Sequence, residues 1–397
     1  MIRGFPRGPF ALAAAITACV GATVGAERSA LPLAADLGGA VAWGAAAFVA
    51  AFGISKAVAN LIAGPSAERF GRRRTLLLGW LIAVPVPVAL AFGSASWTIV
   101  AANVLLGVSQ GLCWTTAIVM QIDAAGPRRR GLAAGVNEFA GYAAVGVAAY
   151  AAAVAAGLLD ARRGPALVAA TAIVFGILLS LAARERAPAR MPATRAPRVS
   201  RPSWPAGRAV IYQAGFMNNA NDALAWAFVP VLLVARGADI AQVGLVAGVY
   251  PAAWAVTQLA SGPLSDRVGR RALVVGGMLL QAGAIAGLAA GGPAVPLALA
   301  WGCGTGMVYP TLVAAAADVA GAADPARAIA VYRFWRDAGV AGGALGSVIV
   351  AGLAGLPATL LVVAGLTAAS GLLAIRLPAR REHPAGPARV TQSAARP

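Results

Sequence analysis

Charged side chains occur inside long apolar stretches of this sequence, where their chemistry needs an explanation. Residues 52–64 read FGISKAVANLIAG, which places Lys56 in an apolar run with Asn60 four residues later. Lys56 is the only lysine, and the other 31 basic residues are arginine. A compact ammonium exchanges partners more readily than a fixed guanidinium fork, so Lys56 and Asn60 are candidate gating or coupling residues. Similar runs hold five further ionisable residues: Glu138, Asp222, Arg333, Arg336 and Asp337.

A stripe of polar residues occurs within FMNNANDALAWAFVP, residues 216–230. Asn218 and Asp222 are four residues apart, and Asn219 and Asp222 are three apart, so they share one face of a helix. With Trp226 one turn later as a stacking surface, this stripe is the best candidate for a substrate site. Hydrogen bonding between helices is the alternative use of such residues. Weaker candidates for the same cavity are Asn103, Gln110 and Tyr309.

Two of the carboxyl groups in apolar runs could carry a proton. Glu138 lies in GVNEFAGY with Tyr142 one turn later, and Asp222 belongs to the polar stripe. Burial disfavours the charged form of a carboxyl group, which suits a residue that binds and releases a proton. Pairing with an arginine would instead keep the group ionised, and the sequence leaves both alternatives open.

The composition indicates an integral membrane protein. Of 397 residues, 59% are hydrophobic and 12% are charged, whereas soluble proteins carry about 25% charged residues. The three cysteines lie in apolar segments without metal-ligand spacing, so we expect no metal and no cofactor. A single histidine, His383, and the lack of a nucleophile constellation argue against an enzyme.

The chain divides into twelve apolar segments, each close to the roughly 20 residues that cross a membrane as a helix. We therefore predict an all-α membrane protein, and the N-terminal segment is interpreted as an uncleaved first span. The predicted spans are 8–28, 40–63, 74–92, 96–121, 131–156, 164–183, 209–234, 240–261, 272–290, 294–317, 328–354 and 357–376.

The arginines are distributed unevenly between the two ends of these spans. The two tails and the loops after even-numbered spans hold 25 basic residues, and the loops after odd-numbered spans hold four. The positive-inside rule therefore places both termini in the cytoplasm of a multi-pass protein, expected in a bacterial inner membrane. Because topology accounts for the net charge of +18, no nucleic-acid partner is expected.

The two halves of the sequence repeat each other. GPSAERFGRRR at 64–74 resembles GPLSDRVGRR at 262–271, an offset of 198, and Asn60 aligns with Gln258. Later the offset is 195, where Asp123 aligns with Asp318. The duplication predicts two pseudo-symmetric six-helix bundles, 1–183 and 209–397, joined by a cytoplasmic linker rich in Arg and Pro, 184–208. The repeated motif residues are Gly64, Glu68, Arg69, Gly71, Arg72 and Arg73, and Gly262, Asp266, Arg267, Gly269, Arg270 and Arg271.

The repeated motif, two copies in register within twelve spans, resembles the signature of the major facilitator superfamily across essentially the whole chain. Independently of that resemblance, Gly and Pro predict a tight turn, and the arginines can bind lipid phosphate or nearby carboxylates. The resemblance implies a cavity lined by helices 1, 4, 7 and 10, a seam between halves formed by 2, 5, 8 and 11, and alternating access. It also implies that the motif locks one side shut, although Glu68 replaces the usual Asp.

The distance of each charged residue from the cytoplasmic end of its helix indicates which charges can meet at the seam. At 1.5 Å per residue, Lys56 lies roughly 12 Å and Asp337 roughly 14 Å from the same side of the membrane. We therefore predict an ion pair between Lys56 and Asp337 in at least one conformation. Arg333 and Asp337 are four residues apart on one helix face, so Arg333 is a competing partner.

The function expected is secondary active transport of a small organic solute by a monomer, as proton-coupled efflux. The basic residues near the pathway favour the alternative of an uptake permease or exchanger for an organic anion or zwitterion. The third hypothesis is a receptor of this family that does not transport. The match to drug exporters of this family is incomplete, because Gly107 stands where they have Arg and helix five lacks their Gly-Pro pair.

Overall fold

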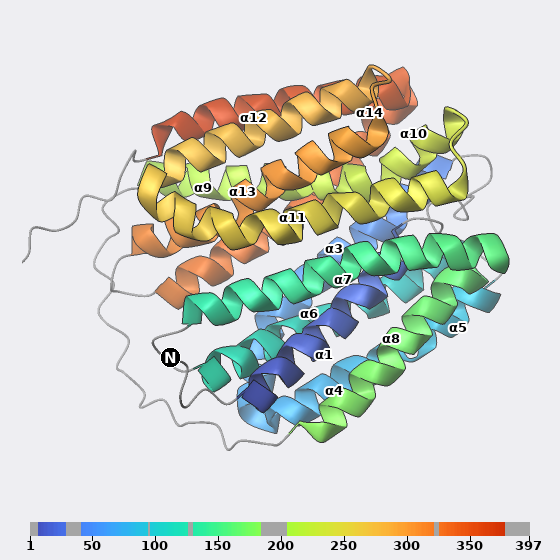
Figure 1. The fold of residues 1–397 in the computed structure, drawn as a ribbon, viewed down its shortest axis with the longest axis vertical. Coiled ribbons are helices and arrows are strands. Elements are labelled where there is room, and N and C mark those ends of the chain that lie inside the picture. Colours follow the sequence, from blue (N-terminus) through green and yellow to red (C-terminus); the bar gives the residue numbers. More distant parts are fainter. Residues whose placement is uncertain are drawn as a thin grey trace, which may run out of the picture.

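The computed structural model describes residues 7–28, 41–93, 96–125, 130–183, 205–320 and 325–377, and these form helices and no strand (Figure 1). The first half contains α1 (Arg7–Ala26), α3 (Val41–Phe70), α4 (Arg72–Ala83), α5 (Pro85–Phe92), α6 (Ser96–Ala125), α7 (Arg130–Leu158) and α8 (Arg163–Ala182). The second half contains α9 (Pro205–Ala223), the π-helical segment η2 (Leu224–Phe228), α10 (Val229–Ala235), α11 (Ile240–Val268), α12 (Arg270–Ala289), α13 (Ala294–Ala320), α14 (Pro325–Leu373) and the 3-10 segment η3 (Ala374–Arg376).

The helices lie side by side in two groups that follow the order of the chain. Figure 1 shows the blue-to-green helices of the first half below the yellow-to-red helices of the second half. The two groups meet where α3 packs on α14 and where α7 packs on α11. We call the end of the bundle that carries Gly71 and Gly269 the loop side, and the opposite end the distal side.

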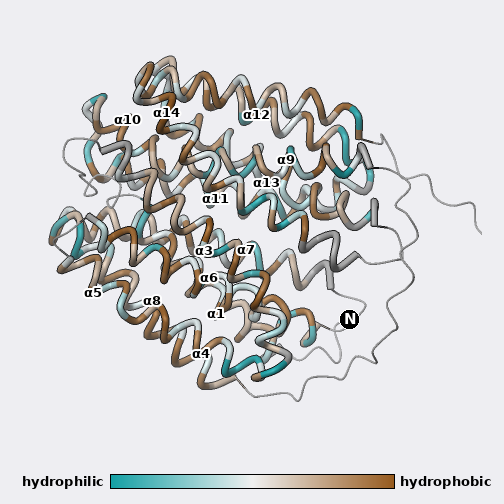
Figure 2. The backbone as a smooth tube through the Cα atoms, turned by 180° about the vertical axis from the view of Figure 1, so that it is seen from behind, coloured by the Kyte–Doolittle hydropathy of each residue, from teal (hydrophilic) through white to brown (hydrophobic). Residues whose placement is uncertain are grey.

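The apolar stretches of the described residues provide ten helices long and apolar enough to cross a membrane. Hydrophobic residues run along the length of the helices, and hydrophilic residues gather at their ends (Figure 2). Large apolar side chains also face outward: Phe92 is 72% exposed, Leu158 80% and Leu353 84%. Such a surface suits a lipid environment, because lipid tails are as apolar as these side chains. The prediction of an all-α membrane protein is confirmed.

Some expected boundaries differ from the observed ones. Of the linker expected at 184–208, residues 184–204 lie outside the described part of the structure. Its last four residues belong to α9, which begins at Pro205. The expected division between spans at 354–357 coincides with Gly355, whose φ of 83° interrupts α14. The span expected at 74–92 corresponds to one apolar helical run, Arg72–Phe92, within which Pro85 removes one helical hydrogen bond between α4 and α5 because it lacks an N–H.

The tight turn expected at the Gly-Pro pair of each repeated motif is wrong. α3 continues through Pro65 to Phe70, and α11 continues through Pro263 to Val268. The chain turns instead at Gly71 (φ 90°, ψ 155°) and Gly269 (φ 95°, ψ 152°). Only glycine adopts that backbone region without strain, whereas one proline near a helix end removes a single hydrogen bond.

Glycines at corresponding positions of the two halves bring helices into close contact. On α6, a Cβ added at Gly107 would lie 2.6 Å from the Phe52 carbonyl oxygen of α3. On α13, a Cβ at Gly302 would clash with the Tyr250 carbonyl oxygen of α11. Gly107 and Gly302 are separated by the offset of 195. Close packing therefore leaves no room for a side chain at position 107 unless α6 moves away from α3.

This packing predicts the effect of one added methyl group. Gly107→Ala should lower the free energy of unfolding by about 1–3 kcal/mol, because α6 must move away from α3. Thermal or detergent-induced unfolding of the purified protein measures the loss. Gly283→Ala on α12 is the matched control, because a Cβ there meets no atom within 4 Å. Equal stability of the two variants would contradict the close contact.

Candidate functional site

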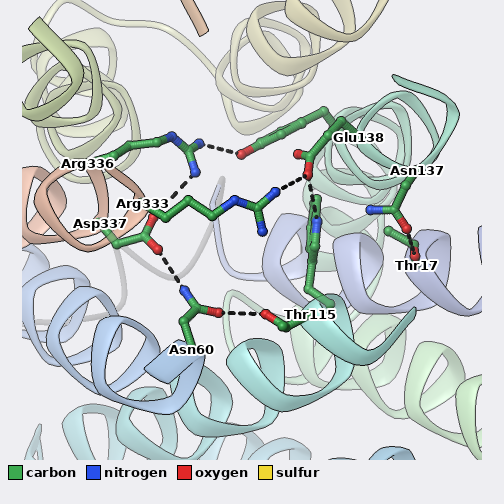
Figure 3. Close-up of polar contacts among 10 residues, drawn as sticks. Thr17, Asn60, Thr115, Asn137, Glu138, Arg333, Arg336 and Asp337 are labelled. Carbon is green, nitrogen blue, oxygen red and sulfur yellow. Dashed lines mark hydrogen bonds and ion pairs between the residues drawn. The ribbon is translucent and has the colours of Figure 1, made fainter. Parts of the chain in front are cut away.

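Polar side chains from both halves meet where α14 packs against α3 and where long side chains of α14 reach α7. Asn60 projects from α3, Glu138 from α7, and Arg333, Arg336 and Asp337 from α14, as Figure 3 shows. The Asp337 side chain is 3% exposed, the Arg336 side chain 5% and the Glu138 side chain 9%. Buried charges require partners, and each of these groups has one from a different helix or an adjacent residue. These contacts form the interface network, defined by Asn60, Thr115, Glu138, Tyr142, Arg333, Arg336 and Asp337.

One line of contacts in the interface network centres on Asp337. The Asn60 amide nitrogen donates to Asp337 Oδ2 at 2.7 Å. The other Asp337 oxygen pairs with Arg336 at 3.3 Å. Arg336 in turn donates to the Tyr142 hydroxyl of α7 at 2.7 Å. The Asn60 oxygen accepts from Thr115 of α6 at 3.0 Å. Asp337 is thereby connected to three helices of the first half.

A second connection between the halves involves Glu138. The Glu138 carboxylate pairs with Arg333 of α14 at 3.5 Å and accepts from the Trp114 indole nitrogen at 3.2 Å. The adjacent Asn137 accepts from Thr17 of α1 at 2.7 Å, which fixes this turn of α7 within the first half (Figure 3). Glu138 can therefore meet its basic partner only while α7 and α14 remain together.

The predicted ion pair between Lys56 and Asp337 is not formed in this conformation. Lys56 Nζ lies 5.7 Å from the centroid of the Phe52 ring and 5.8 Å from that of Trp114. Asn60, one turn nearer the loop side, reaches Asp337 instead. Arg333, the expected competitor, pairs with Glu138. The expectation concerned at least one conformation, so it stays a prediction.

A small polar pocket lies among these groups. It contains three basic and two acidic side chains, which gives an excess of one positive charge when all are ionised. Aromatic rings form part of its wall, and the Arg336 guanidinium lies 4.1 Å from the centroid of the Tyr309 ring. If the halves separate and widen this pocket, its lining offers hydrogen-bonding and charged groups for a polar solute and aromatic rings for an apolar part. The lining residues are Lys56, Asn60, Trp114, Thr115, Glu138, Tyr142, Tyr309, Arg333, Arg336 and Asp337.

The polar stripe of α9 does not face this pocket. The Asn218 oxygen accepts from Gln281 of α12 at 3.0 Å, and Gln281 accepts from Asn221 at 2.9 Å. Thr367 of α14 completes these contacts by donating to Asn221 at 2.9 Å. Asn218 thus takes part in the interhelical hydrogen bonding that the sequence left as an alternative.

The remaining residues of the stripe lie closer to the distal side. One Asp222 oxygen accepts from the Tyr250 hydroxyl, which also contacts Thr305 at 3.3 Å. Asn219 is 2% exposed. Trp226 lies within η2, where a wider i+5 hydrogen-bond pattern precedes Pro230. Asn103 and Gln110 of α6 are also buried but are not among the residues that line the pocket.

Sequence reasoning missed Glu27 and Arg28: Arg28 was only counted among the four basic residues of the loops after odd-numbered spans, and Glu27 was given no role. Both side chains follow α1 directly and are 0% exposed. The Arg28 guanidinium lies 4.6 Å from the centroid of the Trp226 ring. The available signal was an acidic and a basic residue side by side at the end of an apolar run, in a chain with only 14 acidic residues.

The repeated motifs carry matching ion pairs on the loop side. Arg72 pairs with Asp123, and Arg270 pairs with Asp318 at 3.3 Å. Arg271 also donates to the Leu377 carbonyl oxygen at 2.7 Å. These contacts tie the first turns of α4 and α12 to the ends of neighbouring helices. Arg69 and Arg267 are exposed and Arg73 is half-buried, while the side chains of Glu68 and Asp266 lie outside the described part of the structure.

Comparison with known proteins identifies the family of this chain. The family model described as Major Facilitator Superfamily matches residues 10–213 and again residues 211–397. No curated protein matches the sequence. The fold is similar to the crystal structure of a mutant of the nucleoside transporter NupG, with a TM-score of 0.77 at 11% identity, covering 93% of this chain and 100% of that chain. At that identity the likeness to NupG shows the fold alone. Because the two family matches together span nearly all of the sequence, the chain belongs to the Major Facilitator Superfamily, a family of membrane transporters.

Proposed function

We propose that this protein is a secondary active transporter that moves a small organic solute by alternating access. The observation that carries the proposal is the interface network, in which Asn60 and Glu138 bond to residues of α14 around a polar pocket. Contacts between halves that depend on single side chains can be exchanged for contacts with a solute. A pocket between two helical groups is the position from which a bound solute can reach either side of the membrane.

The topology proposed for this transport has twelve spans in two six-helix halves, 1–183 and 209–397. Two observations support twelve rather than ten: Gly355 divides α14, and the run α9–η2–α10 has the length of a span despite its polar residues. The double match to the family model and the arginine distribution support two halves with both termini in the cytoplasm. We place this monomer in a bacterial inner membrane.

Proton-coupled efflux is the first candidate for the transport cycle, with Glu138 as the proton carrier. Glu138 is held in this conformation by Arg333 across the interface. Separation of α7 from α14 would remove that partner and give protons access to the carboxylate. Proton binding would then be tied to the movement of the halves, which is what coupling requires. Asp222, which bonds Tyr250 on the distal side, is the second candidate carrier.

Uptake or exchange of an organic anion or zwitterion is the second candidate. The favouring observation is the charge of the pocket, where Lys56, Arg333 and Arg336 outnumber Glu138 and Asp337. A negatively charged group on the solute would balance this excess.

Transport in proteoliposomes tests the function and its coupling. Labelled amino acids, carboxylates, nucleosides and amines would be supplied with and without a pH gradient of either sign. We expect accelerated movement of at least one solute under a gradient, abolished by a protonophore. Glu138→Gln should remove the acceleration but keep exchange of solute across the membrane, because it retains the size of the side chain without its charge.

The matched control is Asp239→Asn, which removes the charge of an exposed carboxylate at the N-terminus of α11. Asparagine caps a helix as well as aspartate, so this variant should transport like the unaltered protein. Gradient-driven transport by Glu138→Gln at the rate of the unaltered protein would refute the role of Glu138. Failure of every solute to move would refute the proposed function.

The alternation of Lys56 between partners predicts non-additive mutants. In a conformation in which Lys56 pairs with Asp337, Lys56→Ala and Asp337→Ala would each leave one buried charge without that partner, so each should slow transport strongly. The double variant should retain more activity than the product of the two single effects, because no isolated charge remains. Transport no better than that product would contradict coupling. Lys56→Arg isolates the chemistry of the ammonium, and full activity in that variant would reduce Lys56 to a generic positive charge.

A further inference from the structure

A second buried group of charges lies at the distal end of α1 and takes no part in the interface network. Glu27 and Arg28 are both 0% exposed, and Asp222 of α9 is also 0% exposed. The Asp222 carboxylate lies close enough to Arg28 for an electrostatic interaction. Ionised groups removed from solvent are very unfavourable unless hydrogen bonds satisfy them. The bonding of these three residues therefore needs an explanation.

Arg28 has no hydrogen-bond acceptor within the described structure. Its guanidinium carbon lies over the Phe52 ring at 4.7 Å from the centroid and over the Trp226 ring at 4.6 Å. These rings stabilise a cation, but they accept no conventional hydrogen bond. Nε and both terminal nitrogens are buried without a partner. A guanidinium presents five N–H groups in one plane, and this fork fits a carboxylate.

Hydrogen-bond acceptors are unpaired in the same place. Both Glu27 carboxyl oxygens and Asp222 Oδ2 are buried without a hydrogen-bond partner in the described structure. The other Asp222 oxygen is used by Tyr250. The Asn103 side chain is next to the Glu27 carboxyl group, and its own oxygen also lacks a hydrogen-bond donor. The group therefore offers free donors on Arg28 and a free acceptor on Asp222, with Glu27 beside Asn103 as a second acid, and this arrangement complements a ligand that carries both charges.

An apolar pocket adjoins this group. Trp226, which contacts Arg28, and Tyr250, which bonds Asp222, both line a narrow apolar space that holds about one water-sized molecule in this conformation and must widen to take a larger group. The rest of its wall is apolar, with side chains such as Val229, Leu233, Val246 and Leu288. A ligand whose charged end meets Arg28 and Asp222 can thus place an apolar body against Trp226.

We propose that Glu27, Arg28 and Asp222 bind a zwitterionic solute of the amino-acid type with an apolar side chain. The carboxylate of the solute pairs with Arg28, and its ammonium group pairs with Asp222 Oδ2 and Glu27. The apolar side chain lies against Trp226 and the adjoining pocket. A solute with only one of the two charges leaves buried groups unpaired, so the site rejects it. The proposal deepens the second candidate function, and it rests on the proposed transport only for the movement of the bound solute.

Binding to the purified full-length protein in detergent tests this site without transport. The probe is tritiated L-phenylalanine, with 2-phenylethylamine and 3-phenylpropionate as competitors that each lack one charge. We expect saturable binding of phenylalanine, and at least about tenfold weaker competition by either analogue. Absence of saturable phenylalanine binding, or equal competition by an analogue, would overturn the proposal.

Substitution of Arg28 assigns the binding to this residue. Arg28→Gln should weaken phenylalanine binding at least about tenfold and remove the preference over 2-phenylethylamine. Arg163→Gln is the matched control, because the Arg163 side chain is 64% exposed near the distal side and should leave binding unchanged. If Arg28→Gln is not recovered as a monodisperse protein, Arg28→Lys keeps the charge without the planar fork and should show the same loss of preference.

Unchanged affinity in Arg28→Gln, or in Arg28→Lys where that variant is used, would overturn the assignment. The outcome is separate from the proposed function. A protein that moves other solutes under a pH gradient but does not bind phenylalanine would remain a transporter and lose only this site.

Discussion

Charge buried in an apolar bundle is the constraint on which the rest of this structure depends. A charged side chain at the centre of a membrane costs at least about 2.5–3.5 kcal/mol unless it is compensated. This chain buries charges on α3, α7 and α14 and compensates much of that cost between its halves, since Asp337 bonds to Asn60 and Glu138 pairs with Arg333. The contacts that satisfy these charges therefore also connect the two halves, beside the packing of α3 on α14 and of α7 on α11.

The sequence duplication places corresponding residues of the two repeats in contact. Glu138 and Arg333 are separated by the offset of 195, and Arg28 and Trp226 by the offset of 198. Both pairs are in contact in the structure. Corresponding positions of the repeats that lie in contact can thus carry different, complementary side chains. An acid facing an arginine, and an arginine facing an aromatic ring, are two such outcomes. The glycines at 107 and 302 show the same correspondence in backbone packing.

The sequence predicted the helices and the family because apolar length and the repeated motif are local signals. It also identified the charged residues of the interface network, because a charge within an apolar run is conspicuous. Their partners depend on how helices rotate and cross, which spacing alone does not determine. In the structure, Arg333 therefore pairs with Glu138 and not with Asp337, its expected partner. Asn218, expected in a substrate site, instead accepts a hydrogen bond from Gln281 of α12. Arg28 was missed because it follows the end of an apolar run, and only the packing of Phe52 and Trp226 around it reveals its burial.

We infer that the interface network helps to hold the two halves together near the loop side. Pulsed electron-resonance distances can show this, with spin labels at Phe70 and Val268 on the loop side and at Leu158 and Leu353 on the distal side. All four positions are exposed, and the three native cysteines would be replaced by alanine. Neutralising Glu138 and Asp337 together, by Glu138→Gln and Asp337→Asn, should lengthen the Phe70–Val268 distance and shorten the Leu158–Leu353 distance. Distance distributions identical to those of the unaltered network would contradict the account.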